Sequence, residues 1–247
     1  MFQIIKNIKN NDINPFLWIG LPIFIPIIFL IFKAIDTDMF AAIFQGEKGI
    51  IENGTFVILL IAVLFSLRTL KLINKKYKKK YLYISLLFVL GLIYFAGEEI
   101  NWGQHWFNWQ ANDFFERYND QYIGDTSETN FHNISSWFDQ KPRILLTFFV
   151  LFGGIYCPLF LSKNNIGDWK YLAYPSFYCF PSSIVCLLFY LLDNSYKFLC
   201  YGKPGFDISC NYIPTILYLR TSEIIELYIS LFLLIYILSI NIKLKKI

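Results

Sequence analysis

The sequence predicts an all-α integral membrane protein, a polytopic bundle of about six transmembrane helices in which residues 1–247 form one domain. Hydrophobic residues make up 56% of the 247 positions and aromatic residues 20%, which is too apolar for a soluble globule. The apolar residues gather in segments close to the roughly 20 residues that a bilayer core requires. The basic residues collect in alternate connections between these segments.

The apolar segments predict helices at residues 16–32, 54–68, 81–97, 143–161, 171–192 and 223–242. The first segment lacks the small-x-small cleavage site of a signal peptide, so it is interpreted as an uncleaved helix. Pro22 and Pro26 predict a kink there, which membrane helices tolerate when neighbours satisfy the freed carbonyl groups. A short element is expected at 212–219, and 100–109 either continues the third helix or lies along the surface.

The charges orient the bundle. With the N-terminus inside, the inner connections hold 14 of the 22 basic residues, whereas only Asp12 and Asp168 of the 18 acids fall there. Because cytoplasmic loops are enriched in Lys and Arg, both termini are predicted to be cytoplasmic. The protein is expected in a membrane such as the bacterial cytoplasmic (inner) membrane, with membrane lipids as partners. Residues 98–143 form the long outer loop, which is acidic and aromatic.

The net charge of +4 does not indicate a nucleic-acid partner, because the basic excess lies beside membrane ends. Of the five cysteines, Cys157, Cys179 and Cys186 fall within apolar segments, where thiols usually pack as small apolar groups. Cys200 and Cys210 share a predicted outer loop. Whether they form a disulfide is left open by their spacing.

Several glutamates are predicted to share one depth in the membrane. The segment 81–97 spans about 25 Å at 1.5 Å per residue, slightly less than the roughly 30 Å hydrocarbon core. Glu98 and Glu99, which follow it, therefore lie at the outer edge. The same count places Glu226 about 24 Å above the inner end of its helix and Glu223 about one turn higher. Glu52 is expected at a comparable height.

Carboxylates at this depth need an explanation. A charge at a helix centre costs about 2.5 to 3.5 kcal/mol on insertion scales, and crowded carboxylates persist by taking up protons or by sharing a cation. Arg220 can also neutralise one acid without a metal. The alternative is that these acids are exposed helix caps, a role that suits Glu223 at a helix N-terminus. It suits Glu98 and Glu99 less well, because acids at a C-terminus oppose the helix dipole.

The two histidines, His105 and His132, both fall on the acidic side. If the third helix continues, Glu98 and His105 share a face, and Glu128 and His132, four apart, do so on another helical segment. Carboxylate and imidazole in such pairs can share a divalent ion. A three-histidine zinc site, a His-Glu-x-x-His motif, a Gly-x-Ser-x-Gly elbow and a Walker loop are all missing. A carboxylate-rich centre suited to Mg²⁺, Mn²⁺, Ca²⁺, iron or proton handling remains.

Two motifs carry a resemblance. Gly-Glu-Glu-x-x-Trp-Gly-Gln at 97–104, preceded by Glu47-x-Gly49, and Glu-x-Asn-x-His-Asn at 128–133 resemble an uncharacterised family of bacterial polytopic membrane proteins over about a third of the chain. This chain has Asn101, His105 and Ser127 where that family has serine, a basic residue and glycine. The resemblance carries no activity. It implies that a set of residues acts together, namely Glu47, Glu52, Glu98, Glu99, Gln104, Glu128, Asn130 and His132.

Three functions are compatible with the sequence. The first is a metal-dependent enzyme at the outer leaflet acting on a lipid or lipid-linked substrate, with Glu52 or Glu226 as base. Its metal ligands would be Glu98, Glu99, Glu128 and His132, supported by Glu47, Gln104, His105, Asn130 and Glu223. The second is a non-catalytic scaffold that binds a partner through the outer loop, whose Trp102, Trp106 and Trp109 suit an interface. The third is a cation- or proton-coupled transporter, with Ser85 and Ser183 along its route.

Overall fold

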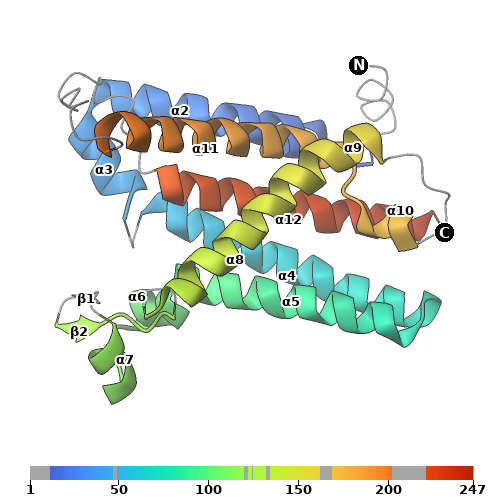
Figure 1. The fold of residues 1–247 in the computed structure, drawn as a ribbon, viewed down its shortest axis with the longest axis horizontal. Helices are drawn as coiled ribbons and strands as arrows, with labels where there is room; N and C mark the ends of the chain where they lie inside the picture. Colours follow the sequence, from blue (N-terminus) through green and yellow to red (C-terminus); the bar gives the residue numbers. More distant parts are fainter. Residues whose placement is uncertain are drawn as a thin grey trace.

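The computed structural model describes residues 12–46, 49–119, 122–123, 125–131, 134–161, 169–201 and 221–246. These residues form a helical bundle with one short antiparallel hairpin, in which Tyr122 pairs with Ser127 and Ile123 with Thr126 (Figure 1). The elements are η1 (Phe16–Gly20), α2 (Leu21–Ile35), α3 (Thr37–Phe44), α4 (Ile50–Lys76), α5 (Lys79–Glu99), η2 (Asn101–Gly103), α6 (Gln104–Phe107), α7 (Asp113–Tyr118), β1 (Tyr122–Ile123), β2 (Thr126–Ser127), α8 (Ser136–Phe148), η3 (Phe149–Tyr156), α9 (Cys157–Phe160), α10 (Trp169–Ala173), η4 (Phe177–Cys179), α11 (Phe180–Tyr201) and α12 (Thr221–Lys245).

The predicted fold class is confirmed. In the described part of the chain, six helical segments are long and apolar enough to cross a membrane: Phe16–Ile35, Ile50–Lys75, Lys79–Glu99, Lys141–Phe160, Trp169–Ser195 and Thr221–Lys245. The second begins at Ile50, earlier than predicted, so Glu52 lies in the first turn of α4 rather than before it. An acid in that turn is favourable for the helix dipole.

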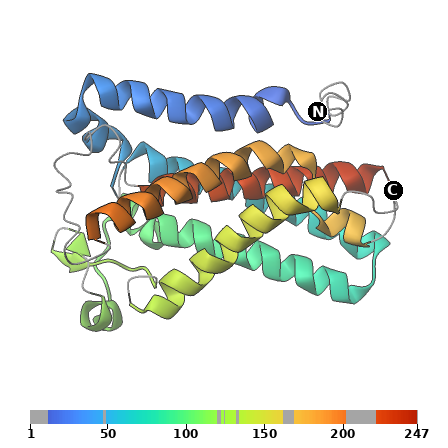
Figure 2. The ribbon, with the colours of Figure 1, turned by 45° about the horizontal axis from the view of Figure 1, so that its top comes forward.

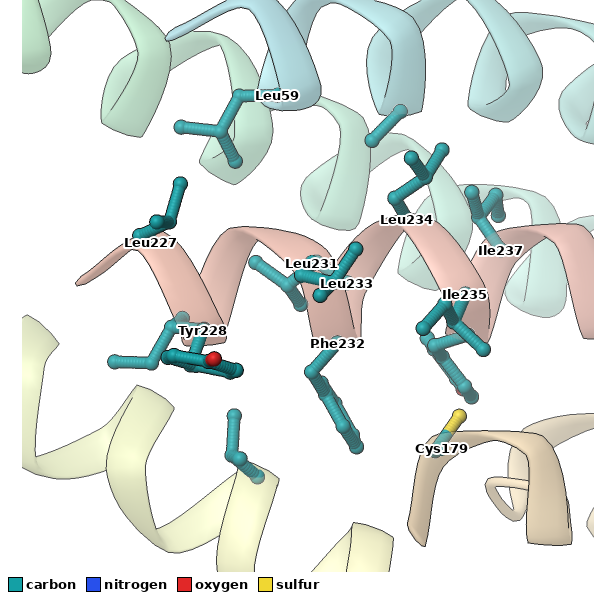
Figure 3. Packing of buried hydrophobic residues seen from close by; sticks show 14 of the residues in the cluster. Leu59, Cys179, Leu227, Tyr228, Leu231, Phe232, Leu233, Leu234, Ile235 and Ile237 are labelled. Atoms are coloured by element: carbon teal, nitrogen blue, oxygen red, sulfur yellow. The ribbon is translucent and has the colours of Figure 1, made fainter. Parts of the chain in front are cut away.

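Helix α12 is the centre of the bundle. Of its most apolar 18-residue window, 89% is buried inside the protein, against 22–39% for the other spans. Its apolar residues cover all faces, as expected of a helix surrounded by protein. It packs against α4 and α11 over most of its length. Figure 3 shows Leu59 of α4 and Cys179 of η4 on opposite sides of α12.

The prolines of the first span are accommodated as predicted. Pro26 has no N–H, so the Pro22 carbonyl, four residues earlier in α2, has no donor within its own helix. The Tyr228 hydroxyl of α12 donates to this carbonyl at 2.8 Å. A neighbouring helix thus satisfies the freed group, which lipid cannot do.

Further polar contacts tie other elements to α12. The Tyr236 hydroxyl donates to the Ala173 carbonyl at 2.7 Å, and the Asn241 amide donates to the Thr69 hydroxyl at 2.7 Å. The three thiols that the sequence placed in apolar segments, those of Cys157, Cys179 and Cys186, are free and buried.

The two ends of the bundle differ in charge, as the sequence predicted. Figure 1 places the start of η1, the end of α12, the turn between α4 and α5, and α10 at one end, and α3, α6, α7 and the hairpin at the other. Lys246 pairs with Asp12 at the first end. The Lys243 ammonium group there donates to the Tyr174 carbonyl at 2.6 Å. The basic connections that the structure describes therefore share one end, while the side of the membrane that this end faces stays a prediction.

The third helix does not continue through 100–109, contrary to one prediction. Helix α5 ends at Glu99, and Asn101, Trp102 and Gly103 have positive φ values of 47°, 54° and 99°. The chain therefore reverses into the one-turn helix α6. One consequence of a continuous helix is therefore wrong, because Glu98 and His105 do not share one helical face.

The second predicted carboxylate–histidine pair also fails as a helical pair. Ser127 belongs to β2, and Glu128 follows it in non-helical chain. His132 itself lies outside the described residues. So do Glu47, Arg220, Cys210 and the element expected at 212–219, and the side chain of Cys200 is likewise not described.

We predict that the basic end faces the cytoplasm, because Lys and Arg are retained there during insertion. A green fluorescent protein fused after Lys246 should fluoresce in a bacterial host, and an alkaline phosphatase fused at the same position should be inactive. Active phosphatase with a dark fluorescent fusion would reverse the orientation.

Candidate functional site

A cavity of about 440 Å³ lies at the acidic end of the bundle, between α4, α5, α8 and α12. One part of its wall is apolar, with Phe88, Leu92 and Phe95 from α5 facing Ile229 and Leu233 from α12. The other part is charged. The structure brings together five carboxyl groups and one guanidinium group there: Glu52, Glu98, Glu99, Glu128, Glu226 and Arg143.

The guanidinium group comes from α8, which crosses the bundle obliquely (Figures 1 and 2). Arg143 forms an ion pair with Glu226 of α12. The Arg143 side chain is 44% exposed and that of Glu226 20%, so the pair lies at the rim of the cavity rather than in its depth. The ion pair links the oblique helix to the central one.

Glu99 is the carboxylate without a hydrogen bond. It ends α5 and is half-buried in the cavity wall, and no described residue donates to it or pairs with it. Its strongest charged neighbours are Glu226 and Glu52, followed by Arg143. The other carboxylates thus surround Glu99, and a single guanidinium group offsets them.

A second polar group in the cavity has no partner in the described structure. The Tyr94 hydroxyl lies on α5 one turn before Glu98, and its oxygen is buried without a hydrogen bond. A buried hydroxyl left without a partner costs about 1–3 kcal/mol. Tyr94 and Glu99 therefore offer a ligand hydrogen-bonding capacity in this cavity.

Glu98, next to Glu99 in sequence, has a different environment. Trp102 Nε1 donates to its Oε1 at 2.7 Å, and the Phe131 backbone N–H donates to its Oε2 at 2.8 Å. The Trp102 indole covers Gly97, where an added Cβ would lie 2.8 Å from the ring. The Gly-Glu-Glu-x-x-Trp sequence therefore builds the reversal after α5, with Glu98 as its hydrogen-bond acceptor.

Gln104 holds the outer loop against this reversal. Its amide group donates to the Ser127 carbonyl at 2.9 Å and to the Trp109 carbonyl at 3.2 Å, and its Oε1 accepts from the Thr129 N–H at 2.8 Å. The Gln104 side chain thus joins the loop segments that contain Trp109, Ser127 and Thr129 through their backbone groups. It supports the site without lining the cavity.

A buried polar network closes the outer end of the cavity. Asn130 donates to Asn101 Oδ1 at 2.8 Å and to Glu128 Oε2 at 2.6 Å, and Asn119 donates to the Glu128 carbonyl at 2.7 Å. Asn101, Glu128 and Asn130 are at most 3% exposed. These contacts give Glu128 and Asn130 a definite structural role in the cap over the cavity.

The remaining predicted site residues lie elsewhere or are not described. Glu223 accepts from the Gly46 N–H at 3.3 and 3.4 Å and does not line the cavity. His105 belongs to α6, but its side chain is not described. Among the described residues, no group of three or more His, Cys, Asp or Glu side chains is placed to hold a metal ion. The metal centre predicted from Glu98, Glu99, Glu128 and His132 stays a prediction, because His132 is not among these residues.

Two residues of the site were missed by the sequence analysis. The sequence analysis used Arg143 only as the first residue of the predicted helix 143–161. An arginine on the acidic side, directly before an apolar segment, could have indicated a partner for the glutamates. Tyr94 carried no signal, because tyrosine is frequent in this chain, with 17 examples. The sequence pointed to Arg220 as the neutralising residue, and the structure provides Arg143 for Glu226.

A second cavity, of about 130 Å³, lies toward the basic end and shares Phe88 with the first. Four residues with hydroxyl groups line it among apolar side chains: Ser66, Thr69, Ser85 and Tyr236. Thr69 and Ser85 donate to backbone carbonyls of their own helices at 3.0 and 2.9 Å. Ser183, which was predicted to line the same route, instead donates to the Cys179 carbonyl and lines neither cavity.

No protein-family profile, no curated protein and no solved structure matches this chain. The resemblance carried by the two motifs therefore stays a prediction, and the function must be argued from the chemistry of the cavity.

The packing of Trp102 on Gly97 gives a stability prediction. Gly97→Leu should destabilise the protein by about 1–3 kcal/mol, since the indole must leave its place. The thermal unfolding midpoint in detergent measures this. Gly91→Leu on the same helix is the control, because a Cβ at Gly91 has no neighbour within 4 Å. Equal midpoints for the two variants would contradict the role of Gly97.

Outside the membrane spans, Glu116 of α7 holds the hairpin. Its Oε1 accepts from the Ser127 N–H at 3.0 Å and from the Thr126 hydroxyl at 2.8 Å. These hydrogen bonds, with that from the Ser127 backbone first, lower the pKa of the Glu116 carboxyl below its ordinary value of 4.5. The ionised form is therefore the one that the folded loop favours.

This direction predicts how the loop responds to acid. The contribution of Glu116 is present above the ordinary carboxyl pKa of 4.5 and is lost as the pH falls through the lower folded pKa. Hydrogen exchange of the Ser127 amide, corrected for intrinsic rates, should show falling protection in that range. Glu116→Gln should show low protection throughout. A pH profile shared by both proteins would rule the mechanism out.

Proposed function

We propose that this protein is a membrane enzyme that binds the polar group of a lipid or lipid-linked substrate in the cavity between α4, α5, α8 and α12 and acts on it by acid–base chemistry. The observation that carries the proposal is the composition of the wall. Charged groups from four helices and the loop after β2 face apolar side chains across one space of about 440 Å³. Such a mixed wall suits a molecule with one polar and one apolar part.

Glu99 is the proposed general base. It is held at the end of α5 without a hydrogen bond, whereas Glu226 is paired with Arg143 and Glu98 accepts from Trp102. A general base must reach the proton that it accepts, and Glu99 lines the cavity in which the substrate would lie. Glu52, which the sequence analysis favoured together with Glu226, is the second candidate because it lies beside Glu99.

The proposed step is a displacement at a carbonyl or phosphoryl centre. Glu99 accepts the proton of an attacking water or hydroxyl as the new bond to oxygen forms. The same proton passes to the leaving oxygen as its bond to the centre breaks, so no net charge is left behind. The Tyr94 hydroxyl, close to Glu98 on α5, is positioned to donate a hydrogen bond to oxygen that gains negative charge.

The cavity supports an enzyme better than the two alternatives. A carrier needs a polar route across the membrane, and the wall of the second cavity is mostly apolar side chains with Phe88 between the two spaces. A scaffold needs an outer surface but no cavity. Exposed aromatic residues are present on the outer loop, such as Phe107 and Trp137, each 72% exposed. They do not account for carboxylates gathered inside the bundle.

Lipid turnover by the purified protein tests the proposal. Wild-type protein in vesicles of a total bacterial lipid extract should convert one lipid class, followed by mass spectrometry. Glu99→Gln should lower the rate by about 10²–10⁴-fold, the usual contribution of a general base.

Asp38→Asn is the matched control, because Asp38 is an exposed acid on α3 at the same end of the bundle and does not line the cavity. Its rate should equal that of the wild type. A lipid profile that wild type and Glu99→Gln leave equally unchanged would contradict the enzyme proposal.

A further inference from the structure

The cavity opens toward the surface of the bundle between α5 and α8. Gly91 of α5 and Phe138 and Leu145 of α8 line the cavity and are exposed at the same time, with Phe138 50% and Leu145 68% exposed. The opposite wall is closed, since Ile229 and Leu233 of α12 are 1% and 2% exposed. Gly91 and Leu145 lie within the candidate membrane spans Lys79–Glu99 and Lys141–Phe160, and Phe138 lies just before the second, so we infer that the opening faces lipid.

The outer end of the same cavity is covered. Asn101, Glu128 and Asn130 form the buried network described above and leave at most 3% of each residue exposed. Gln104 fixes this cover to the reversal after α5 through its hydrogen bonds to Ser127 and Thr129. A ligand that comes from the bilayer therefore has a direct way in, whereas one that comes from outside water meets the cap.

The charges define the polar group that fits. Five carboxyl groups and one guanidinium group line the cavity, so a positively charged group is favoured inside and an isolated anion is not. At the rim the sign changes. The Arg143 side chain is 44% exposed there, and a guanidinium group carries five N–H donors, enough to contact Glu226 and a phosphate together.

We propose that the substrate is an amine-bearing zwitterionic phospholipid of the phosphatidylethanolamine type, which enters from the bilayer between α5 and α8. Its ammonium group lies among the carboxylates near Glu99, its phosphate lies at Arg143, and its chains leave past Gly91 and Leu145. This inference rests on the proposed function, because it names the substrate class of that same cavity.

Gly91 keeps the entrance open. A Cβ built on Gly91 has no atom within 4 Å, so a larger side chain there occupies the opening without displacing protein atoms. Leu87, one turn earlier on α5, is 69% exposed and does not line the cavity. Substitutions at these two positions therefore distinguish an effect on the entrance, at Gly91, from an effect on the lipid-facing surface, at Leu87.

Photo-crosslinking tests the inference on the full-length protein. Phosphatidylcholine nanodiscs carry either a diazirine-labelled phosphatidylethanolamine or the matched phosphatidylglycerol probe, and crosslinked peptides are identified by mass spectrometry. The first probe should label α5 and α8 at least about tenfold more than the second, as expected for charge-assisted hydrogen bonds that only the amine can donate. Gly91→Leu should abolish most of this labelling, and Leu87→Phe should leave it unchanged.

Leu145→Trp, on the opposite rim, gives a second and independent obstruction, and it should also reduce labelling. Equal labelling by the two probes would overturn the amine specificity. Labelling that avoids α5 and α8, or that both obstructing variants leave unchanged, would overturn the lateral entrance.

The lipid-turnover assay separates this inference from the proposed function. Conversion of a lipid without an amine group would overturn the inference and leave the enzyme proposal standing. Selective labelling by the phosphatidylethanolamine probe, with no turnover of any lipid, would support the binding mode and overturn the enzyme proposal alone.

Discussion

The structure depends on one constraint, that polar groups inside a membrane bundle find their partners within the protein because hydrocarbon supplies none. Helix α12 shows how the constraint is met. It is buried almost entirely, and its few polar side chains reach the elements around it: Tyr228 bonds the carbonyl that Pro26 leaves without a donor, and Asn241 bonds Thr69 of α4. Each contact fixes the position of a neighbour relative to α12. Helix α8 is joined to α12 by a different contact, the ion pair between Arg143 and Glu226.

Within this well-satisfied bundle, the exceptions are informative. Glu98 and Glu99 are consecutive, yet Glu98 accepts hydrogen bonds from Trp102 and Phe131, whereas no residue that the structure describes donates to Glu99. The difference arises because the chain reverses directly after them, so that Trp102 and Phe131 come to Glu98 while Glu99 is directed to the cavity wall. Tyr94, whose hydroxyl lacks a partner, lines the same cavity. Such unpartnered polar groups lower the stability of the protein. Binding of a ligand therefore explains their presence in the cavity better than a contribution to stability does.

The sequence predicted the parts of the fold that depend on composition along the chain. Hydropathy identified all six spans and lysine placement identified the common basic end, since both are sums over many residues. The reversal at Asn101 and Trp102 escaped prediction, because positive φ at two residues that are not glycine is imposed by tertiary contacts, here the Trp102–Glu98 and Asn101–Asn130 hydrogen bonds. The depth count brought the glutamates to one level. It carried no information on direction around each helix axis, so it did not separate Glu223, which bonds Gly46, from Glu226.

The two motifs that carry the resemblance have a structural meaning that is separate from the chemistry. Gly97, Glu98, Trp102 and Gln104 build the reversal, and Asn130 joins Glu128 to Asn101 in the cap. Within the first motif, Glu99 faces the cavity, and no residue in the described part of the chain donates a hydrogen bond to it. The charge opposite it comes from Arg143, and the apolar walls come from α5, α8 and α12, all of which lie outside the motifs apart from the end of α5. The motifs therefore specify a cap that excludes water from one end of the cavity, and the helices specify what the cavity binds. A cap of this kind explains why acidic residues are retained at the membrane edge, because carboxylates shielded from water interact more strongly with a cationic group than exposed ones do.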